Sequence, residues 1–124
     1  MAPIAVADLR ACLESLHRTW NRRRFVHPDP LETLYAYPDP RDQEIVGLVA
    51  AGLAYGRVAQ ILASVDRALA PLGPSPRASL DAATARRIEG WYAGFRHRFT
   101  AGSELSALLT AVKRATARHG TLEA

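Results

Sequence analysis

The chain has 124 residues, and its hydrophobic fraction of 48% excludes an intrinsically disordered protein and suffices for one domain with a core. Sixteen Lys and Arg residues against twelve Asp and Glu give a formal net charge of +4. Cys12 is the only cysteine, which excludes an internal disulfide, and no apolar run is long enough to span a membrane, so we expect a cytoplasmic protein with no membrane partner.

The first predicted element is an amphipathic helix over residues 5–21. Its apolar residues recur at spacings of three and four, namely Val6, Leu9, Leu13, Leu16 and Trp20. Arginines occupy positions 22–24 and could bind phosphates, or could simply end the helix in solvent, because cations favour helix C-termini.

Two Asp-Pro pairs, at positions 29–30 and 39–40, each predict a helix start, because Asp can cap the helix and Pro fits its first turn. The first pair opens a short helix over residues 31–37. The second opens a helix over about residues 40–55, in which no residue from Ile45 to Tyr55 is charged. A helix that is apolar on every side has no face for water, so we expect its neighbours to cover it.

Four more helices are expected, over residues 57–72, 76–82, 84–92 and 104–119. Ser75 and Ser103 are the predicted caps of the second and fourth of these, and Gly120 ends the last. No alternating run bounded by turn residues predicts a strand. The predicted fold is all-α, a compact multi-helix bundle around the central buried helix, forming a single domain over residues 1–124.

The positive charge is uneven along the chain. Residues 1–62 hold seven Arg and seven acidic residues, whereas residues 63–124 hold nine Lys and Arg against five acidic residues. A basic half suggests an anionic partner such as DNA, although moderate charge also simply keeps a protein soluble.

A basic and aromatic run, Phe95 to Phe99, is the first candidate site. Arg96, His97 and Arg98 lie between the two phenylalanines, a mixture that suits a phosphate backbone together with base stacking. The alternative is a helix in which both phenylalanines pack inward and both arginines face water. His97 by itself is expected to be a polar surface residue and not a base.

The corner Tyr55-Gly56-Arg57 is the second candidate site. Gly56 permits an unusual backbone angle and can leave the N–H groups at the start of the next helix open to an anion or a nucleic acid. The alternative is an ordinary tight corner with a half-buried Tyr55.

No catalytic residue, cofactor or metal ligand set is predicted. The four histidines, at positions 17, 27, 97 and 119, have no metal-ligand spacing, and only one cysteine is present to join them. The phosphate-binding loop, GxGxxG and GxSxG motifs are all absent.

Two segments resemble the N-terminal half of an uncharacterised bacterial family, the Domain of Unknown Function 2400 family. They are residues 22–69, RRRFVHPDPLETLYAYPDPRDQEIVGLVAAGLAYGRVAQILASVDRAL, and residues 95–123, FRHRFTAGSELSALLTAVKRATARHGTLE. The resemblance implies that the chain is an N-terminal fragment of a protein about twice as long, and it assigns no activity.

The order of the predicted helices is also similar to the first part of the helix-hairpin-helix DNA glycosylases, which include endonuclease III. That resemblance implies a DNA surface near Tyr55, Gly56 and Arg57, with the catalytic residues beyond this chain. Three hypotheses follow. The first is a helical domain that binds nucleic acid, the second is one half of a base-removing enzyme, and the third is a structural or protein-interaction domain.

Overall fold

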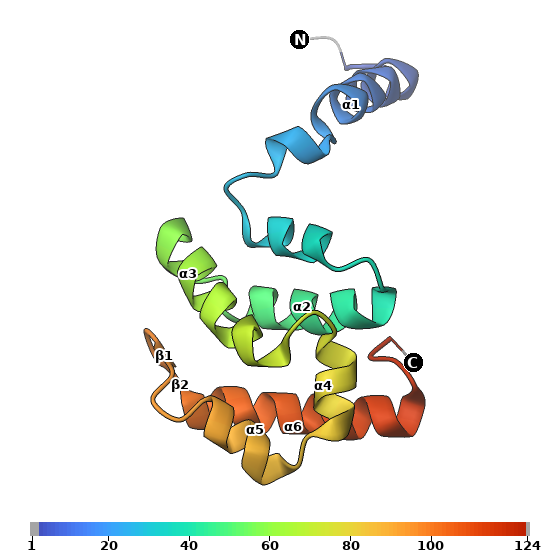
Figure 1. Cartoon of the computed structure of the whole chain (residues 1–124). Coiled ribbons are helices and arrows are strands. Elements are labelled where there is room, and N and C mark those ends of the chain that lie inside the picture. The colour runs from blue at the N-terminus through green and yellow to red at the C-terminus, as the bar shows by residue number, and fades with distance from the viewer. Residues whose placement is uncertain (1–2, 124) are drawn as a thin grey trace.

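The computed structural model describes residues 3–123 and is built almost entirely of helices (Figure 1). The elements in chain order are α1 (Val6–Trp20), η1 (Arg23–Phe25), η2 (Pro30–Ala36), α2 (Pro40–Gly52), α3 (Val58–Leu69), η3 (Ala70–Leu72), α4 (Pro76–Ala82), α5 (Ala85–Trp91), β1 (Arg96–His97), β2 (Thr100–Ala101) and α6 (Gly102–His119). The all-α class is confirmed. The short hairpin of β1 and β2 is a correction to the prediction that no strand would occur, and η2 is a 3₁₀ helix where a short helix over residues 31–37 was expected.

The predicted helix caps are mostly confirmed. The carboxylates of Asp29 and Asp39 accept hydrogen bonds from the backbone N–H groups of Leu31 and Arg41, both at 2.8 Å. The Arg41 side chain also donates to Asp39, and this lowers the pKa of the Asp39 carboxyl below its ordinary value.

The predicted cap at Ser103 is wrong, because α6 begins earlier, at Gly102. A Cβ atom on Gly102 would lie 1.8 Å from the Tyr92 carbonyl oxygen, so the absent side chain lets α6 start directly against the end of α5. The carboxylate of Glu104 then reaches back to the backbone N–H of Ala101 at 2.8 Å and satisfies that donor.

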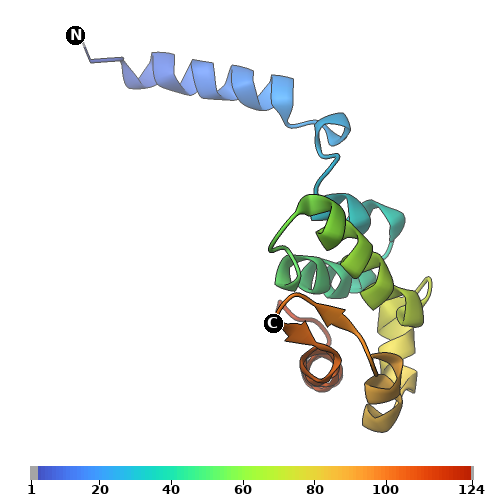
Figure 2. The ribbon, with the colours of Figure 1, turned by 90° about the vertical axis from the view of Figure 1, so that its left-hand side faces the viewer.

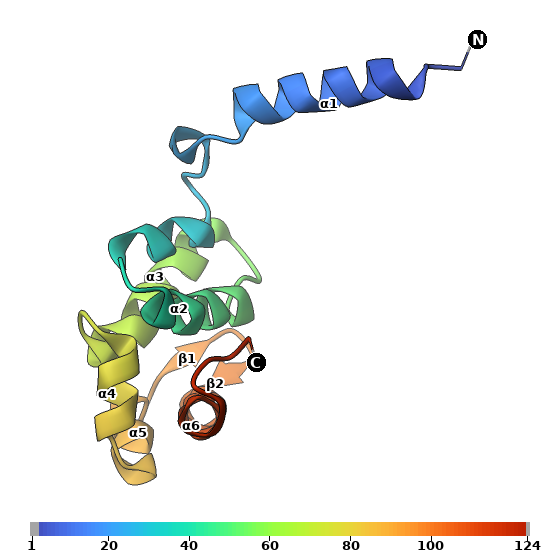
Figure 3. The same cartoon turned by 90° about the vertical axis from the view of Figure 1, so that its right-hand side faces the viewer.

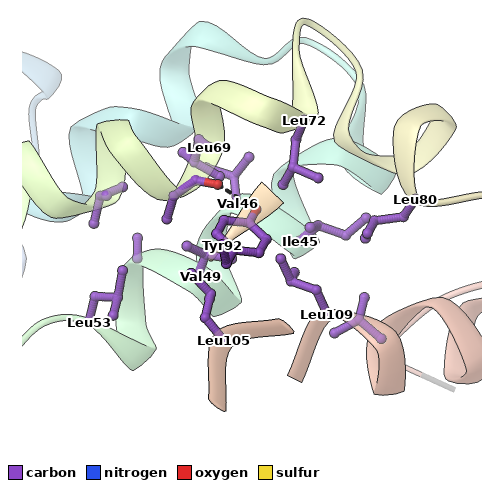
Figure 4. Close-up of a cluster of buried hydrophobic side chains, with 14 of the residues drawn as sticks. Ile45, Val46, Val49, Leu53, Leu69, Leu72, Leu80, Tyr92, Leu105 and Leu109 are labelled. Atoms are coloured by element: carbon purple, nitrogen blue, oxygen red, sulfur yellow. Dashed lines mark hydrogen bonds between the residues drawn. The ribbon is translucent and has the colours of Figure 1, made fainter. Parts of the chain in front are cut away.

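The core packs against one side of α2 and draws on every later helix (Figure 4). The fully enclosed side chains include Ile45, Val46, Val49, Val65, Leu72, Leu80, Ile88, Tyr92 and Leu109. Two acidic residues of α2 also hold other segments. Buried Asp42 accepts from the backbone N–H of Arg77 at 2.9 Å, at the start of α4, and Glu44 accepts from the N–H of Leu122.

The central helix is covered on one side and not all round. Ile45, Val46 and Val49 are buried against η2, α3 and α4, but Leu48 is 37% exposed and Gly52 is exposed. The expectation that neighbours would cover this helix on every side is therefore wrong. The helix also ends at Gly52 and not near Tyr55.

Helix α1 stands away from the other helices. Figures 2 and 3 show it projecting from one end of the molecule. None of its residues is buried, and its apolar stripe, from Val6 to Trp20, faces solvent. No helix within residues 3–123 combines the length and the hydropathy that crossing a membrane requires.

Candidate nucleic-acid interface

The corner between α2 and α3 is built from Tyr55, Gly56 and Arg57. Gly56 has a φ of 101°, a backbone angle that other residues rarely adopt. Arg57 is the extended N-cap residue of α3, and its side chain is exposed. The corner therefore turns the chain sharply and presents a cation where the next helix begins.

The hairpin of β1 and β2 places Arg98 and Phe99 at its tip. Arg96 pairs with Ala101 and His97 with Thr100, so the turn consists of two residues only. Arg98 has a φ of 50°, where such turns usually have Gly or Asn. Phe99, beside it, is 80% exposed.

The structure brings the two predicted sites together. A Cβ atom on Gly56 would lie 2.7 Å from Nη1 and 2.9 Å from Cδ of Arg98, so the Arg98 side chain occupies the space that a side chain at position 56 would take. The corner and the hairpin tip, about 40 residues apart in sequence, thus form one surface. We call it the hairpin–corner surface and define it as Tyr55, Gly56, Arg57, Arg96, Arg98 and Phe99.

Tyr55 ties the hairpin to the corner. Its hydroxyl donates to the carbonyl oxygen of His97 at 2.7 Å and also lies within hydrogen-bond distance of the Thr100 hydroxyl. One side chain therefore holds both strands next to the turn. Its ring lies parallel to that of Phe99, with an interplanar angle of 6° and ring centroids 6.2 Å apart.

His97 lies beneath the surface, which corrects the expectation of a polar surface residue. It is 3% exposed, with Nδ1 at 2.7 Å from Ser64 Oγ and Nε2 at 3.1 Å from the Tyr55 carbonyl oxygen. A carbonyl can only accept, so Nε2 carries a proton. Arg67 donates to Ser64 Oγ at 3.1 Å, which leaves the Ser64 hydroxyl free to donate to Nδ1. His97 thus links the hairpin to α3 and to the corner through two hydrogen bonds.

The alternative interpretation of residues 95–99, in which both phenylalanines pack inward, holds for Phe95 and not for Phe99. Phe95 is partly buried against the core and packs edge-on to Tyr92, with ring centroids 6.1 Å apart. Phe99 does not pack inward, because the run forms a hairpin and not a helix, and Phe99 lies in the turn at its tip.

Part of the basic second half has a structural role. Arg77 donates to the carbonyl oxygens of Thr116 and Gly120 at the C-terminal end of α6, and Lys113 donates to those of Leu80 and Asp81 in α4. Cations are favourable at these carbonyls because the helix dipole is negative there. Two of the nine cations over residues 63–124, Arg77 and Lys113, therefore bind helix ends within the chain.

An open groove with a volume of about 890 Å³ lies beside the hairpin, between α5 and α6. Arg96 and Arg114 line it together with small residues such as Ala107 and Ala111. The groove is thus continuous with the hairpin–corner surface through Arg96. Among residues 3–123 no group of three His, Cys, Asp or Glu side chains lies close enough to hold a metal ion.

Sequence reasoning predicted five of the six residues of this surface, together with His97 beneath it, and missed several of their partners. Phe99 was left open between base stacking and inward packing, and Ser64, Arg67 and Thr100 were not considered. The contacts of Ser64 and Arg67 with the hairpin join residues about 30 positions apart, so no local pattern reports them.

A sequence family described as "Protein of unknown function (DUF2400)" matches residues 29–124. The match contains the whole hairpin–corner surface and excludes α1. No curated protein and no solved structure gives a match.

Proposed function

The chain belongs to the DUF2400 family of proteins of unknown function, and from its own geometry we propose that it binds nucleic acid through the hairpin–corner surface. The observation that supports the proposal is that Arg98 lies against Gly56 and Phe99 lies beside Tyr55, so the hairpin tip meets the corner that also carries the exposed Arg57. Arginine forks suit phosphate oxygens, and exposed aromatic rings suit bases.

The charges of the surface are available to a ligand. Within residues 3–123, no carboxylate forms an ion pair with Arg57, Arg96 or Arg98. Each is exposed, so contact with a phosphate would release counterions at little cost in protein desolvation. DNA is the first partner to test, because its duplex carries about one negative charge per 1.7 Å of helix axis.

The Arg98 backbone adds to this support. A non-glycine residue with positive φ costs about 1–2 kcal/mol relative to an ordinary conformation. Residues held in such conformations cluster at functional sites, and here the conformation directs a guanidinium over Gly56 towards the corner.

The test is a binding titration with a fluorescent DNA duplex and with a single strand, repeated over a range of salt. We expect binding at about 50 mM salt that weakens steeply as salt rises. Arg57→Gln and Arg98→Gln should each weaken binding and reduce the salt slope by about one.

Arg118→Gln is the matched control. Arg118 is an exposed arginine near the C-terminal end of α6, about 24 Å along the helix from Gly102. Its replacement should leave binding almost unchanged. Absence of binding to both probes at about 50 mM salt, or an equal loss in all three variants, would contradict the proposal.

A finer function, a scaffold related to DNA glycosylases that lacks a complete active site in this chain, rests on the order of the helices alone. Fold analogy is a weak warrant for activity. The coding sequence after Ala124 tests this extension. A glycine-rich hairpin followed by a catalytic Lys or Asp would support it, and a stop codon or a continuation without both features would count against it.

The second candidate function is self-association through α1. Val6, Leu9, Leu13, Leu16 and Trp20 alternate at spacings of three and four, which is the narrow stripe of a coiled-coil seam, and all five are exposed. Such a seam fits a second copy of the same helix.

Light scattering with and without DNA separates this candidate from the first. Self-association predicts a dimer that DNA does not change, and Leu13→Glu should make it monomeric. Ala11→Glu, on the opposite side of α1, is the control and should leave the dimer intact. A monomeric wild-type chain would exclude this candidate.

A further inference from the structure

Phe99 is the most exposed aromatic side chain of the hairpin–corner surface, and nothing in the fold requires it to be there. It is 80% exposed, and it is held at the tip of a two-residue turn. A large apolar ring in such a position forfeits the stabilisation that burial would give. Its position therefore needs an explanation other than packing.

The Phe99 ring lies beside the ring of Tyr55. Tyr55 lies parallel to it at 6°, and the Tyr55 hydroxyl fixes both strands through His97 and Thr100. The turn in front of it is fixed by the positive φ of Arg98. Phe99 thus presents most of its ring to solvent from a turn whose two flanking strands are held by hydrogen bonds.

The cations beside the ring fit a backbone that passes it. The Arg98 guanidinium lies 5.7 Å from the Phe99 ring centroid and reaches over Gly56 to the corner that carries Arg57. A nucleotide strand that places a phosphate near these two arginines brings a base within reach of the ring. Inside an intact duplex both faces of each base are already stacked, so only an unpaired base offers a free face.

We propose that Phe99 is a stacking residue that recognises an unpaired nucleobase, so that the hairpin–corner surface prefers nucleic acid with an unpaired base over a perfect duplex. The inference rests on the proposed function, because the arginines must first hold the backbone. It adds a preference for the structure of the strand, and stacking makes that preference tolerant of sequence.

The test compares a perfect DNA duplex with the same duplex carrying one unpaired base. The wild-type chain should bind the second more tightly by about fivefold or more. Phe99→Ala should remove this difference, weakening binding to the unpaired-base duplex by about fivefold to 150-fold while changing binding to the perfect duplex little. The salt slope should stay the same, because no phosphate contact is lost.

Three further variants separate stacking from other effects. Phe99→Trp should keep the preference, because it keeps a planar ring, whereas Phe99→Leu should lose it although it stays apolar. Phe25→Ala, an exposed phenylalanine that lies against Trp20, is the matched control and should keep it. A fluorescent base analogue at the unpaired position should be quenched by the wild-type chain and not by Phe99→Ala.

The failure of this inference is distinguishable from the failure of the proposed function. If neither duplex binds at about 50 mM salt, the proposed function is wrong. If both duplexes bind equally and Phe99→Ala changes neither, the surface holds phosphates and the stacking role of Phe99 is overturned. If Phe99→Leu keeps the preference, a simple apolar contact replaces stacking, which also overturns the inference.

Discussion

Gly56→Ala is the substitution that most directly tests how the corner and the hairpin are joined. It has two separable effects. The φ of 101° at position 56 is strained for any residue with a Cβ, so we expect a loss of stability of about 1–3 kcal/mol. The new Cβ would also lie 2.7 Å from Arg98 Nη1, so the flexible guanidinium must move away.

The two effects need two measurements. Thermal unfolding reports the strain, and a loss of 1 kcal/mol corresponds to a fall in Tm of roughly 3–5 °C in a chain of this size. Binding to DNA reports the displacement of Arg98. We expect the affinity of Gly56→Ala to fall about as far as that of Arg98→Ala, and the double variant to bind no more weakly than Arg98→Ala.

Gly120→Ala is the matched control. Gly120 also has a positive φ, of 83°, but an added Cβ would meet no atom within 4 Å. It should lose stability to a similar extent and keep its affinity for DNA. An unchanged Tm in Gly56→Ala would refute the strain, and equal DNA affinity of Gly56→Ala and Gly120→Ala would refute the displacement of Arg98.

Three other predictions concern stability and can be checked by denaturant unfolding. Asp42→Ala should cost about 1–3 kcal/mol, because the Arg77 backbone N–H loses its buried partner at 2.9 Å. Tyr92→Phe should cost about 1 kcal/mol, since its hydroxyl donates to the Ala68 carbonyl oxygen at 2.6 Å. Burial raises the pKa of Tyr92 above its ordinary value of 10.0, so its contribution to stability is complete below pH 10.0 and is lost as the pH rises further. The free energy of unfolding should therefore fall less above pH 10.0 in Tyr92→Phe than in the wild-type chain, and an equal fall in both would contradict this. Gly102→Ala should cost about 3 kcal/mol or more, because a Cβ 1.8 Å from the Tyr92 carbonyl oxygen forces the backbone to shift; an unchanged denaturant midpoint would exclude that close approach.

The sequence by itself determined the helical class, most helix boundaries and their caps. Asp29, Asp39 and Ser75 act on backbone groups within three residues, so their roles can be read locally. The sequence also contained both halves of the candidate site, because Gly56 and the basic and aromatic run stand out by residue type.

Only the tertiary structure decided how these parts meet. The two-residue strands of the hairpin are too short to leave an alternating pattern, and the burial of His97 depends on Ser64, 33 positions away. The exposure of Leu48 and of the whole apolar stripe of α1 was also beyond sequence reasoning. Periodicity shows which side of a helix is apolar, but whether a neighbour covers that side depends on long-range packing, which no local pattern encodes.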